Sequence, residues 1–289
     1  MLSTRPKPGA SQPISRSARS VSVHAVLFAI VCVSLALGPA SAQELYTNGP
    51  ISNSSGTASN GADESVLETS IGDQELGRPN GPDPFDQRVA DDFEIPGPAN
   101  WTVTAVSVYG YQDLSVVGRG ELSTFSNISL RIWDGEPGMM GSTIVFQTSG
   151  LEGSFFTDVY RVSEATSGSS LLRPIFENQV AVNMVLAPGT YWVDWQAEGT
   201  VDDGGPFVPP IPSEGEPGVT GDAKAYSINT GWVDLVDSNS GNAKGVPFRI
   251  EGFEGGDLNV LEVPSLRTWG IFTLMALLSV VAIRQLRLS

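Results

Sequence analysis

Apolar residues between positions 43 and 263 recur at every second position in short runs, and no stretch keeps a 3.6-residue apolar period for three helical turns. Residues 128–133 and 180–186 show the alternation clearly. A period of two places successive side chains on opposite faces of a strand, and Gly, Pro and Asn separate the runs. The chain is therefore predicted to be all-β, folding as an antiparallel β-sandwich, with the jelly roll as one form of that fold.

The same pattern predicts individual strands. The run 101–109 is rich in β-branched and aromatic residues, and its apolar phase slips near Ala105, which indicates a β-bulge. The runs 180–186 and 191–196 flank Pro188-Gly189, an arrangement that predicts a β-hairpin. Further strands are expected at residues 143–147, 155–162, 223–228, 232–236 and 248–252.

Turn-forming residues divide the rest of this region. Residues 43–88 are crowded with Asn-Gly, Gly-Pro and Ser-rich turns, so they are predicted to be a loop-rich lead-in with edge strands, including a short strand at 65–68. Residues 89–262 carry the alternating runs and form the predicted β-sandwich domain. Within it, the proline-rich stretch 204–218 is predicted to be a long extended loop.

The first 42 residues contain the three parts of a secretory signal peptide. Basic residues without any acid occupy positions 1–20, an apolar run follows at 21–37, and small residues close the segment. Ala40 and Ala42 fit a cut after Ala42, which predicts Gln43 as the mature N-terminus and the Sec-type export machinery and signal peptidase as partners. The alternative is an uncleaved signal anchor.

Residues 263–289 place a second apolar segment at the other end. Trp269 to Ile283 carries no charge and is followed by Arg284 and Arg287. As a helix this run is about 22 Å long, shorter than the ~30 Å hydrocarbon core, so it spans only with snorkelling arginines or a thinned bilayer. The arginines are expected to stay cytoplasmic. This predicts a C-terminal transmembrane helix, with a buried core helix as the alternative.

The order of motifs in this segment is similar to a known sorting signal. The tetrapeptide Val263-Pro264-Ser265-Leu266 precedes Trp269-Gly270, the apolar run and the terminal arginines. This order resembles the IPTL type of C-terminal signal, a relative of the PEP-type signals of Gram-negative bacteria. The resemblance implies an exosortase-like sorting enzyme that recognises the segment in the inner membrane, then releases the protein or transfers it to the surface. Arg267 and Thr268 replace the Ser and the acidic or amide residue usual in that family.

A looser resemblance covers about 165 residues of the body. Five short segments are similar to a module that recurs in large secreted and surface proteins of bacteria: Val89–Phe93, Tyr109–Tyr111, Ile132–Gly135, Leu186–Trp192 and Pro247–Gly252. The resemblance implies a β-sandwich and a surface role, and it implies no enzymatic activity.

The only histidine and the only cysteine are His24 and Cys32, and both lie in the signal peptide. The mature chain therefore has neither imidazole nor thiolate, which excludes Ser-His-Asp and Cys-His catalysis, disulfides and His/Cys zinc sites. The protein is predicted to be non-enzymatic. A glycoside hydrolase that uses two carboxylates is the remote alternative.

Charge is unevenly distributed along the chain. The whole chain has a net charge of −16, but residues 43–263 hold all 32 acidic residues against nine of the 16 basic ones, a net charge of −23. A field of that sign repels phosphate backbones, so nucleic acid is excluded as a partner.

Acidic turns provide the candidate metal ligands. Asp91, Asp92, Asp134 and Asp237 lie in such turns, and carboxylate oxygens suit a structural calcium ion in an extracellular protein. None of the turns fits an EF-hand, and a solvated turn is the alternative at each position. No other cofactor is predicted.

Two tryptophans provide the candidate ligand contacts. Trp133 and Trp192 lie out of phase with the apolar positions of their strands, and an aromatic ring on a sheet face can stack on a sugar of an extracellular polysaccharide. Packing under a loop is the alternative. The sequence as a whole predicts an exported, envelope- or surface-associated β-sandwich protein, with a glycan-binding or calcium-dependent adhesin as the alternative.

Overall fold

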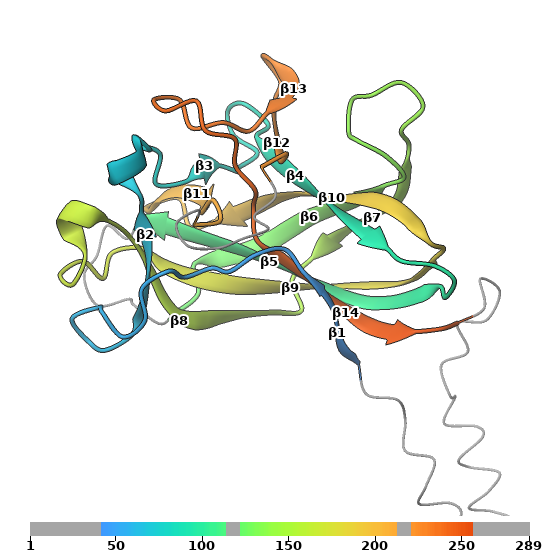
Figure 1. Cartoon of the computed structure of the whole chain (residues 1–289), viewed down its shortest axis with the longest axis horizontal. Helices are drawn as coiled ribbons and strands as arrows, with labels where there is room; N and C mark the ends of the chain where they lie inside the picture. The colour runs from blue at the N-terminus through green and yellow to red at the C-terminus, as the bar shows by residue number, and fades with distance from the viewer. Residues whose placement is uncertain (1–41, 114–121, 213–220, 257–289) are drawn as a thin grey trace, which may run out of the picture. The chain divides into compact units, whose positions relative to one another are not determined.

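The computed structural model describes residues 42–113, 122–212 and 221–256 (Figure 1). Within these ranges the protein is all-β, as the sequence predicts, and its helical structure is limited to two 3₁₀ turns, η1 (Thr69–Ile71) and η2 (Glu164–Thr166). The predicted signal helix and C-terminal helix lie outside these ranges. In the described part, no helix has the length and apolarity needed to cross a bilayer.

Fourteen described strands form two sheets. The larger sheet has eight strands, six of them in the order β1-β14-β5-β9-β8-β2, while β11 pairs with both β3 and β5 beside this path. Its strands are β1 (Gln43–Thr47), β14 (Phe248–Glu254), β5 (Trp101–Asp113), β9 (Pro174–Leu186), β8 (Gly153–Ser163), β2 (Asp63–Leu67), β11 (Gly204–Val208) and β3 (Arg78–Pro79). Among the described pairs only β2 and β8 run parallel, which corrects the prediction of a purely antiparallel sandwich at this edge.

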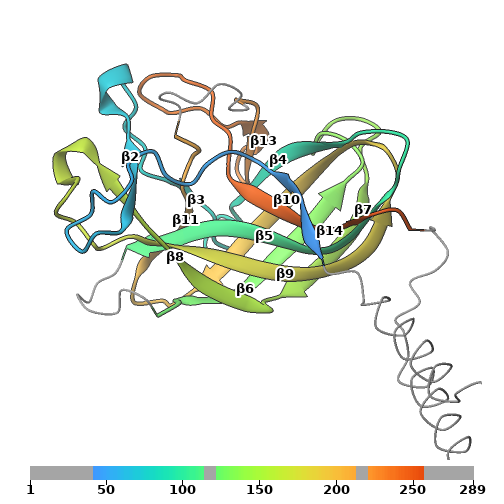
Figure 2. The same cartoon turned by 60° about the horizontal axis from the view of Figure 1, so that its bottom comes forward.

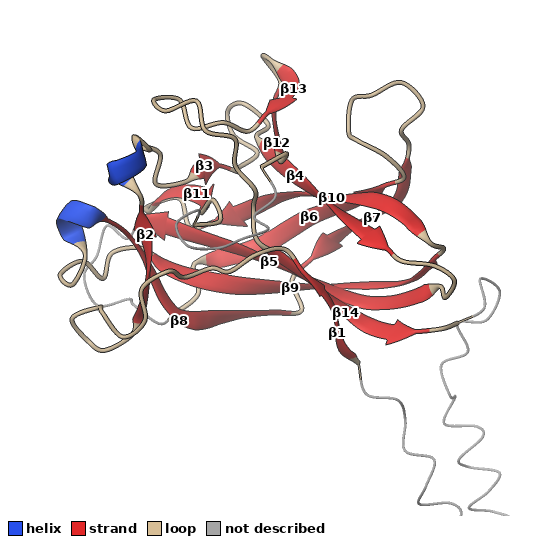
Figure 3. Ribbon diagram, viewed as in Figure 1, coloured by secondary structure: helices blue, strands red, loops and turns tan. Residues whose placement is uncertain are grey.

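The smaller sheet has six strands in the order β13-β12-β4-β10-β6-β7, all paired antiparallel. Its strands are β13 (Gly231–Asp234), β12 (Lys224–Ser227), β4 (Arg88–Ile95), β10 (Gly189–Gly199), β6 (Phe125–Trp133) and β7 (Ile144–Gly150). Figure 3 shows the two layers of strands, with loops gathered at their ends.

The main hydrophobic core lies between the two sheets. Val106 and Val108 of β5 contribute from the larger sheet, while Val193 and Trp195 of β10 contribute from the smaller one. All four side chains are at most 1% exposed. Because strand side chains alternate between faces, the positions next to these residues point away from the core. The period-two pattern of the sequence therefore reports burial between two sheets.

The predicted bulge is confirmed. In the pairing of β5 with β14, Val103 and Ala105 lie opposite the consecutive residues Gly252 and Glu251, so that β5 has one extra residue at the predicted place. The slip in the apolar phase near Ala105 is the sequence signature of this extra residue.

The predicted hairpin is wrong. β9 pairs with β5 and β8 in the larger sheet, whereas β10 pairs with β4 and β6 in the smaller one. The turn at Ala187-Pro188 therefore carries the chain from one sheet to the other. Two consecutive strands with alternating apolar residues can face each other across a core just as well as they can pair edge to edge, so the pattern alone does not separate these arrangements.

The lead-in supplies both edges of the larger sheet. β1 lies at one edge beside β14, and β2 lies at the other beside β8 (Figure 2). A second apolar cluster packs on the face of this sheet opposite the main core, where Ile51 of the lead-in and Phe207 of β11 contact buried side chains. These buried side chains are Tyr109, Tyr111, Val159 and Ile175. The lead-in therefore forms the strands at both edges of the larger sheet and also covers part of one face.

The proline-rich stretch is only partly the predicted loop. Residues 204–208 form β11, in which Gly204 and Phe207 pair with β5 at Asp113 and Tyr111. Pro206 lies where this register is irregular, so its missing N–H interrupts no regular ladder. The Phe207 ring also stacks on Tyr111, with centroids 5.5 Å apart.

Candidate functional site

The outer face of the smaller sheet brings together the two tryptophans that the sequence singles out. Trp192 of β10 and Trp133 of β6 are directly paired across adjacent strands. Because Val193 and Trp195 point into the core, Trp192 and Asp194 point outward. The prediction that Trp192 and Trp133 lie off the apolar phase of their strands therefore places both on one face.

A buried carboxylate organises this face. Asp194 is fully buried, and its Oδ1 lies 2.5 Å from Nε of Arg88, whose side chain is also buried. Its Oδ2 accepts a hydrogen bond from Trp133 Nε1 at 3.0 Å and lies 3.6 Å from Arg131. Burial raises the pKa of Asp194, while the two guanidinium groups and the indole N–H oppose that rise. The hydrogen bond from the indole N–H therefore fixes the orientation of the Trp133 ring.

The two tryptophans differ in accessibility. Trp192 is only 5% exposed, and the ammonium of Lys224 lies 6.0 Å from the centre of its ring. Lys224 is itself held by Glu136 at 2.8 Å and Asp234 at 2.6 Å. This leaves little of the Trp192 ring for a sugar to stack on.

Trp133 is partly exposed, and a depression of about 300 Å³ lies over the same strand and its neighbour β7. Polar side chains line most of it, among them Ser129, Arg131, Gln147 and Ser149. Trp133 is not among the residues that line this depression, so the hypothesis of glycan binding stays a prediction.

A second group of polar residues surrounds Asp91. The structure brings Asp91 and Asp92 of β4 close to Asp222, with one carboxylate oxygen of each within 4.8 Å of the others. Asp91 is buried, Asp92 half-buried and Asp222 exposed. Sequence reasoning missed Asp222 because it is far from β4 in the chain, and only the pairing of β12 with β4 brings it there.

Hydrogen bonds already occupy both oxygens of Asp91. Its Oδ2 accepts from Asn48 Nδ2 at 2.7 Å and from the backbone N–H of Val246 at 2.8 Å, and its Oδ1 accepts from the N–H of Asp92. Burial raises the pKa of Asp91 to about 7, against the opposing effect of these donors. The calcium hypothesis at this position stays a prediction.

The other two predicted metal ligands lie apart from this group and from each other. Asp134 closes the loop between β6 and β7 by accepting hydrogen bonds from the N–H and hydroxyl of Thr143. Asp237 accepts backbone N–H bonds from Gln74, Glu75, Asn239 and Ser240. Burial opposes the effect of these N–H groups, which nevertheless lower the pKa of Asp237 to about 2. Both carboxylates have roles in shaping loops.

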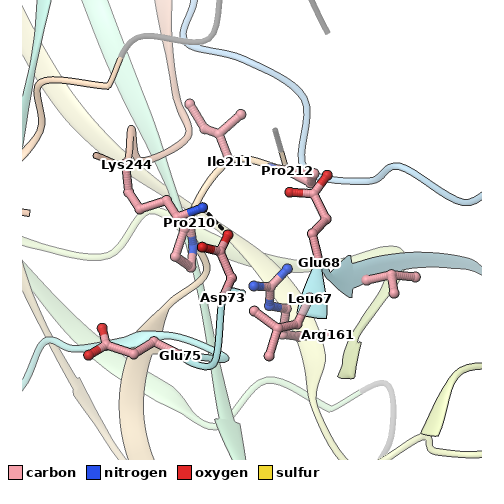
Figure 4. A pocket seen from close by; sticks show the side chains of 10 residues that line it. Leu67, Glu68, Asp73, Glu75, Arg161, Pro210, Ile211, Pro212 and Lys244 are labelled. Carbon is pink, nitrogen blue, oxygen red and sulfur yellow. Dashed lines mark hydrogen bonds and ion pairs between the residues drawn. The ribbon is translucent and has the colours of Figure 1, made fainter. Parts of the chain in front are cut away.

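A buried charged cluster joins the lead-in to the segment before β14, and sequence reasoning did not find it. Lys244 forms an ion pair with Asp73, and the two side chains are 5% and 2% exposed. Figure 4 shows them in a small cavity that Glu68 and Arg161 also line. Arg161 donates to the backbone carbonyls of Leu76 and Ser65. No periodic pattern or motif in the sequence signals this arrangement.

Asp91→Asn is expected to flatten the pH dependence of stability. Asp91 has a pKa of about 7 in the folded protein and an ordinary value of 3.8, so its proton favours the native state fully below pH 3.8. This contribution is lost as the pH rises through 7. Between about pH 4 and pH 8, the wild type should lose on the order of 2–4 kcal/mol more stability than the variant, measured by urea unfolding.

Asp134→Asn is the control, because it makes the same change at an exposed carboxylate that lies apart from Asp91. Its stability should follow that of the wild type across the same pH range. Parallel curves for the wild type and Asp91→Asn would show that Asp91 does not titrate in this interval.

The residues of the predicted targeting signals are mostly outside the described part of the chain. This applies to Ala40 and to the sorting motif from Val263 to Arg287. Ala42 is described and exposed, and it directly precedes β1.

The fold and these contacts define the chain as a two-sheet β-sandwich protein with buried charged clusters. Comparison with known proteins takes this no further: no family model matches the chain, and no curated protein is significantly similar to it.

Proposed function

We propose that the protein is a non-enzymatic, exported β-sandwich protein of the cell envelope, delivered by an N-terminal signal peptide and sorted through its C-terminal segment. The observation that carries the proposal is the extent of the folded unit, which fits between the two predicted signals. β1 begins at Gln43, directly after the expected cut, and Ala42 is exposed, as a peptidase site must be. β14 ends at Glu254, before the sorting motif begins at Val263.

In this proposal each end of the chain has one role in export and sorting. The signal peptide engages the Sec-type machinery and is removed by signal peptidase. The helix from Trp269 to Ile283 then holds the protein in the inner membrane, with Arg284 and Arg287 in the cytoplasm. An exosortase-like enzyme cuts near Val263-Pro264-Ser265-Leu266, after which the domain is released or attached at the surface. The proposal also includes a helix at each end of the chain and jelly-roll connectivity for the sandwich.

The acidic surface suits such a location. Net charge far from zero keeps an exported domain soluble, and a charge of −23 over residues 43–263 repels nucleic acids and anionic headgroups. It leaves cations and neutral polysaccharides as the compatible partners.

Trp269→Ala is expected to hold the protein in the inner membrane. The full-length gene is expressed in a Gram-negative host that has an exosortase-like enzyme, and inner-membrane, outer-membrane and medium fractions are examined by mass spectrometry. The wild type should lose both ends and leave the inner membrane, with Gln43 as its first residue. The variant should also begin at Gln43 but keep its C-terminal segment, because the Trp-Gly pair is part of the recognised motif.

Thr268→Ala is the matched control, since Thr268 already departs from the family pattern and its replacement should change little. A wild type that stays full length in the inner membrane would contradict the sorting proposal.

A further inference from the structure

The buried pair of Lys244 and Asp73 has the composition of a covalent cross-link site. Asp73 lies in the lead-in between η1 and β3, and Lys244 lies between β13 and β14. Their side chains are in direct contact, and both are almost completely shielded from water. Holding an amine against a carboxyl group and excluding water both favour the formation of an amide.

Two further donors act on the carboxyl group of Asp73. Its Oδ1 accepts a hydrogen bond from Ser240 Oγ at 2.6 Å and another from Asn242 Nδ2 at 3.0 Å. Its Oδ2 is the oxygen that contacts Lys244 Nζ. The two oxygens are therefore distinguished: donors polarise one of them, as they would stabilise the oxyanion of a tetrahedral intermediate, and the other is next to the amine.

We propose that Lys244 and Asp73 form an intramolecular isopeptide bond. The ammonium of Lys244 first gives a proton to Oδ2 of Asp73, and the resulting amine attacks Cγ. Ser240 and Asn242 stabilise the negative charge that develops on Oδ1. The C–Oδ2 bond then breaks, and Oδ2 leaves as water with the two protons that the nitrogen has lost. An ammonium and a carboxylate become one amide and one water, so the step needs no oxidant, reductant or other reactant.

The surrounding cavity fits this step. Its volume is about 10 Å³, room for roughly one water molecule, which is the by-product. Figure 4 shows that the pair lies beside Pro210 and Ile211 on one side and Arg161 on the other. Glu68 and Glu75 also line the cavity, and the proton balance of the step closes without them.

The cross-link would close a loop of the chain that contains most of the strands of the sandwich. Residues 73 to 244 include every strand from β3 to β13, so the bond would tie the lead-in to the segment that leads into the last strand. Lys224 provides an internal comparison. It also contacts two carboxylates, but Glu136 and Asp234 have 38% and 77% of their side chains exposed, and water competes there for both partners.

Peptide mapping of the denatured full-length protein tests the proposal. Trypsin should fail to cut after Lys244, so residues 225–249 should appear as one peptide joined to the peptide that ends at Arg88. The joined mass should be the sum of the two peptides less one water. Free peptides that end at Lys244, with the full calculated mass, would overturn the proposal and leave a plain ion pair.

Two variants distinguish a covalent bond between these residues from a simple ion pair. Lys244→Arg keeps the positive charge but cannot form the amide, so the joined peptide should disappear and the melting temperature should fall. Lys224→Arg is the matched control and should retain the joined peptide. If Lys244→Arg fails to fold, the mass of the wild type still decides the question, because that measurement does not depend on any variant.

Discussion

Asp194→Ala is expected to destabilise the protein by about 3–5 kcal/mol, because it leaves a buried guanidinium without its partner. Arg88 is 2% exposed, and its remaining hydrogen bonds run to the hydroxyl and carbonyl of Ser129 at 3.4 and 3.0 Å. The substitution also removes the acceptor of the Trp133 indole N–H. Urea unfolding followed by tryptophan fluorescence gives the change in free energy.

The matched control is Asp234→Ala, which removes an exposed partner of Lys224 and should cost less than about 1 kcal/mol. The double variant Arg88→Met/Asp194→Leu should recover much of the loss, since apolar groups of similar size leave no uncompensated charge. A loss below about 1 kcal/mol for Asp194→Ala would mean that water reaches Arg88.

Trp195→Ala is expected to cost about 3–5 kcal/mol through the cavity it opens in the main core. Trp195 is 1% exposed and packs edge-on against Phe248 of the facing sheet, with ring centroids 6.2 Å apart. Its indole N–H also donates to the side-chain oxygen of Asn80 at 3.2 Å when that amide is oriented to match its neighbours. Both contributions join β10 to other parts of the fold.

Trp195→Phe should cost less than Trp195→Ala, because it keeps the aromatic contact and loses mainly the N–H bond and part of the volume. Trp232→Ala is the control on the partly exposed edge of the same sheet, where it contacts Tyr226 at 5.3 Å between ring centroids. Thermal unfolding of all three variants provides the comparison. Equal losses for Trp195→Ala and Trp232→Ala would contradict the assignment of Trp195 to the core.

Periodicity predicted the strands because alternation reports which face of a strand is buried. It predicted the bulge in β5 for the same reason, since an extra residue must shift the phase. It did not predict which strands are neighbours. The turn at Pro188-Gly189 has the residues of a hairpin, yet the chain passes between sheets there, because both arrangements bury Val193 and Trp195 equally well.

The contacts around the candidate sites were less predictable than the strands. Asp91 and Asp92 are adjacent in sequence and were found as an acidic pair, but Asp222 joins them only through strand pairing. Asp73 and Lys244 lie in loops without any periodic pattern, and an ion pair between positions so far apart leaves no local trace in the sequence. Trp133 and Trp192 were predicted to lie off the apolar phase of their strands, but the sequence did not show that the two strands are paired. The ammonium near the Trp192 ring comes from Lys224, on a strand two positions away along the sheet.

The pairing of β1 determines when this domain can finish folding. β1 is the first strand to be synthesised, and its partner in the described sheet is β14, the last strand. Roughly 200 residues must emerge before that pair can close, and contacts of such long sequence separation slow folding. The edge of the larger sheet at β1 and β14 is therefore expected to be among the last parts of the described sandwich to form.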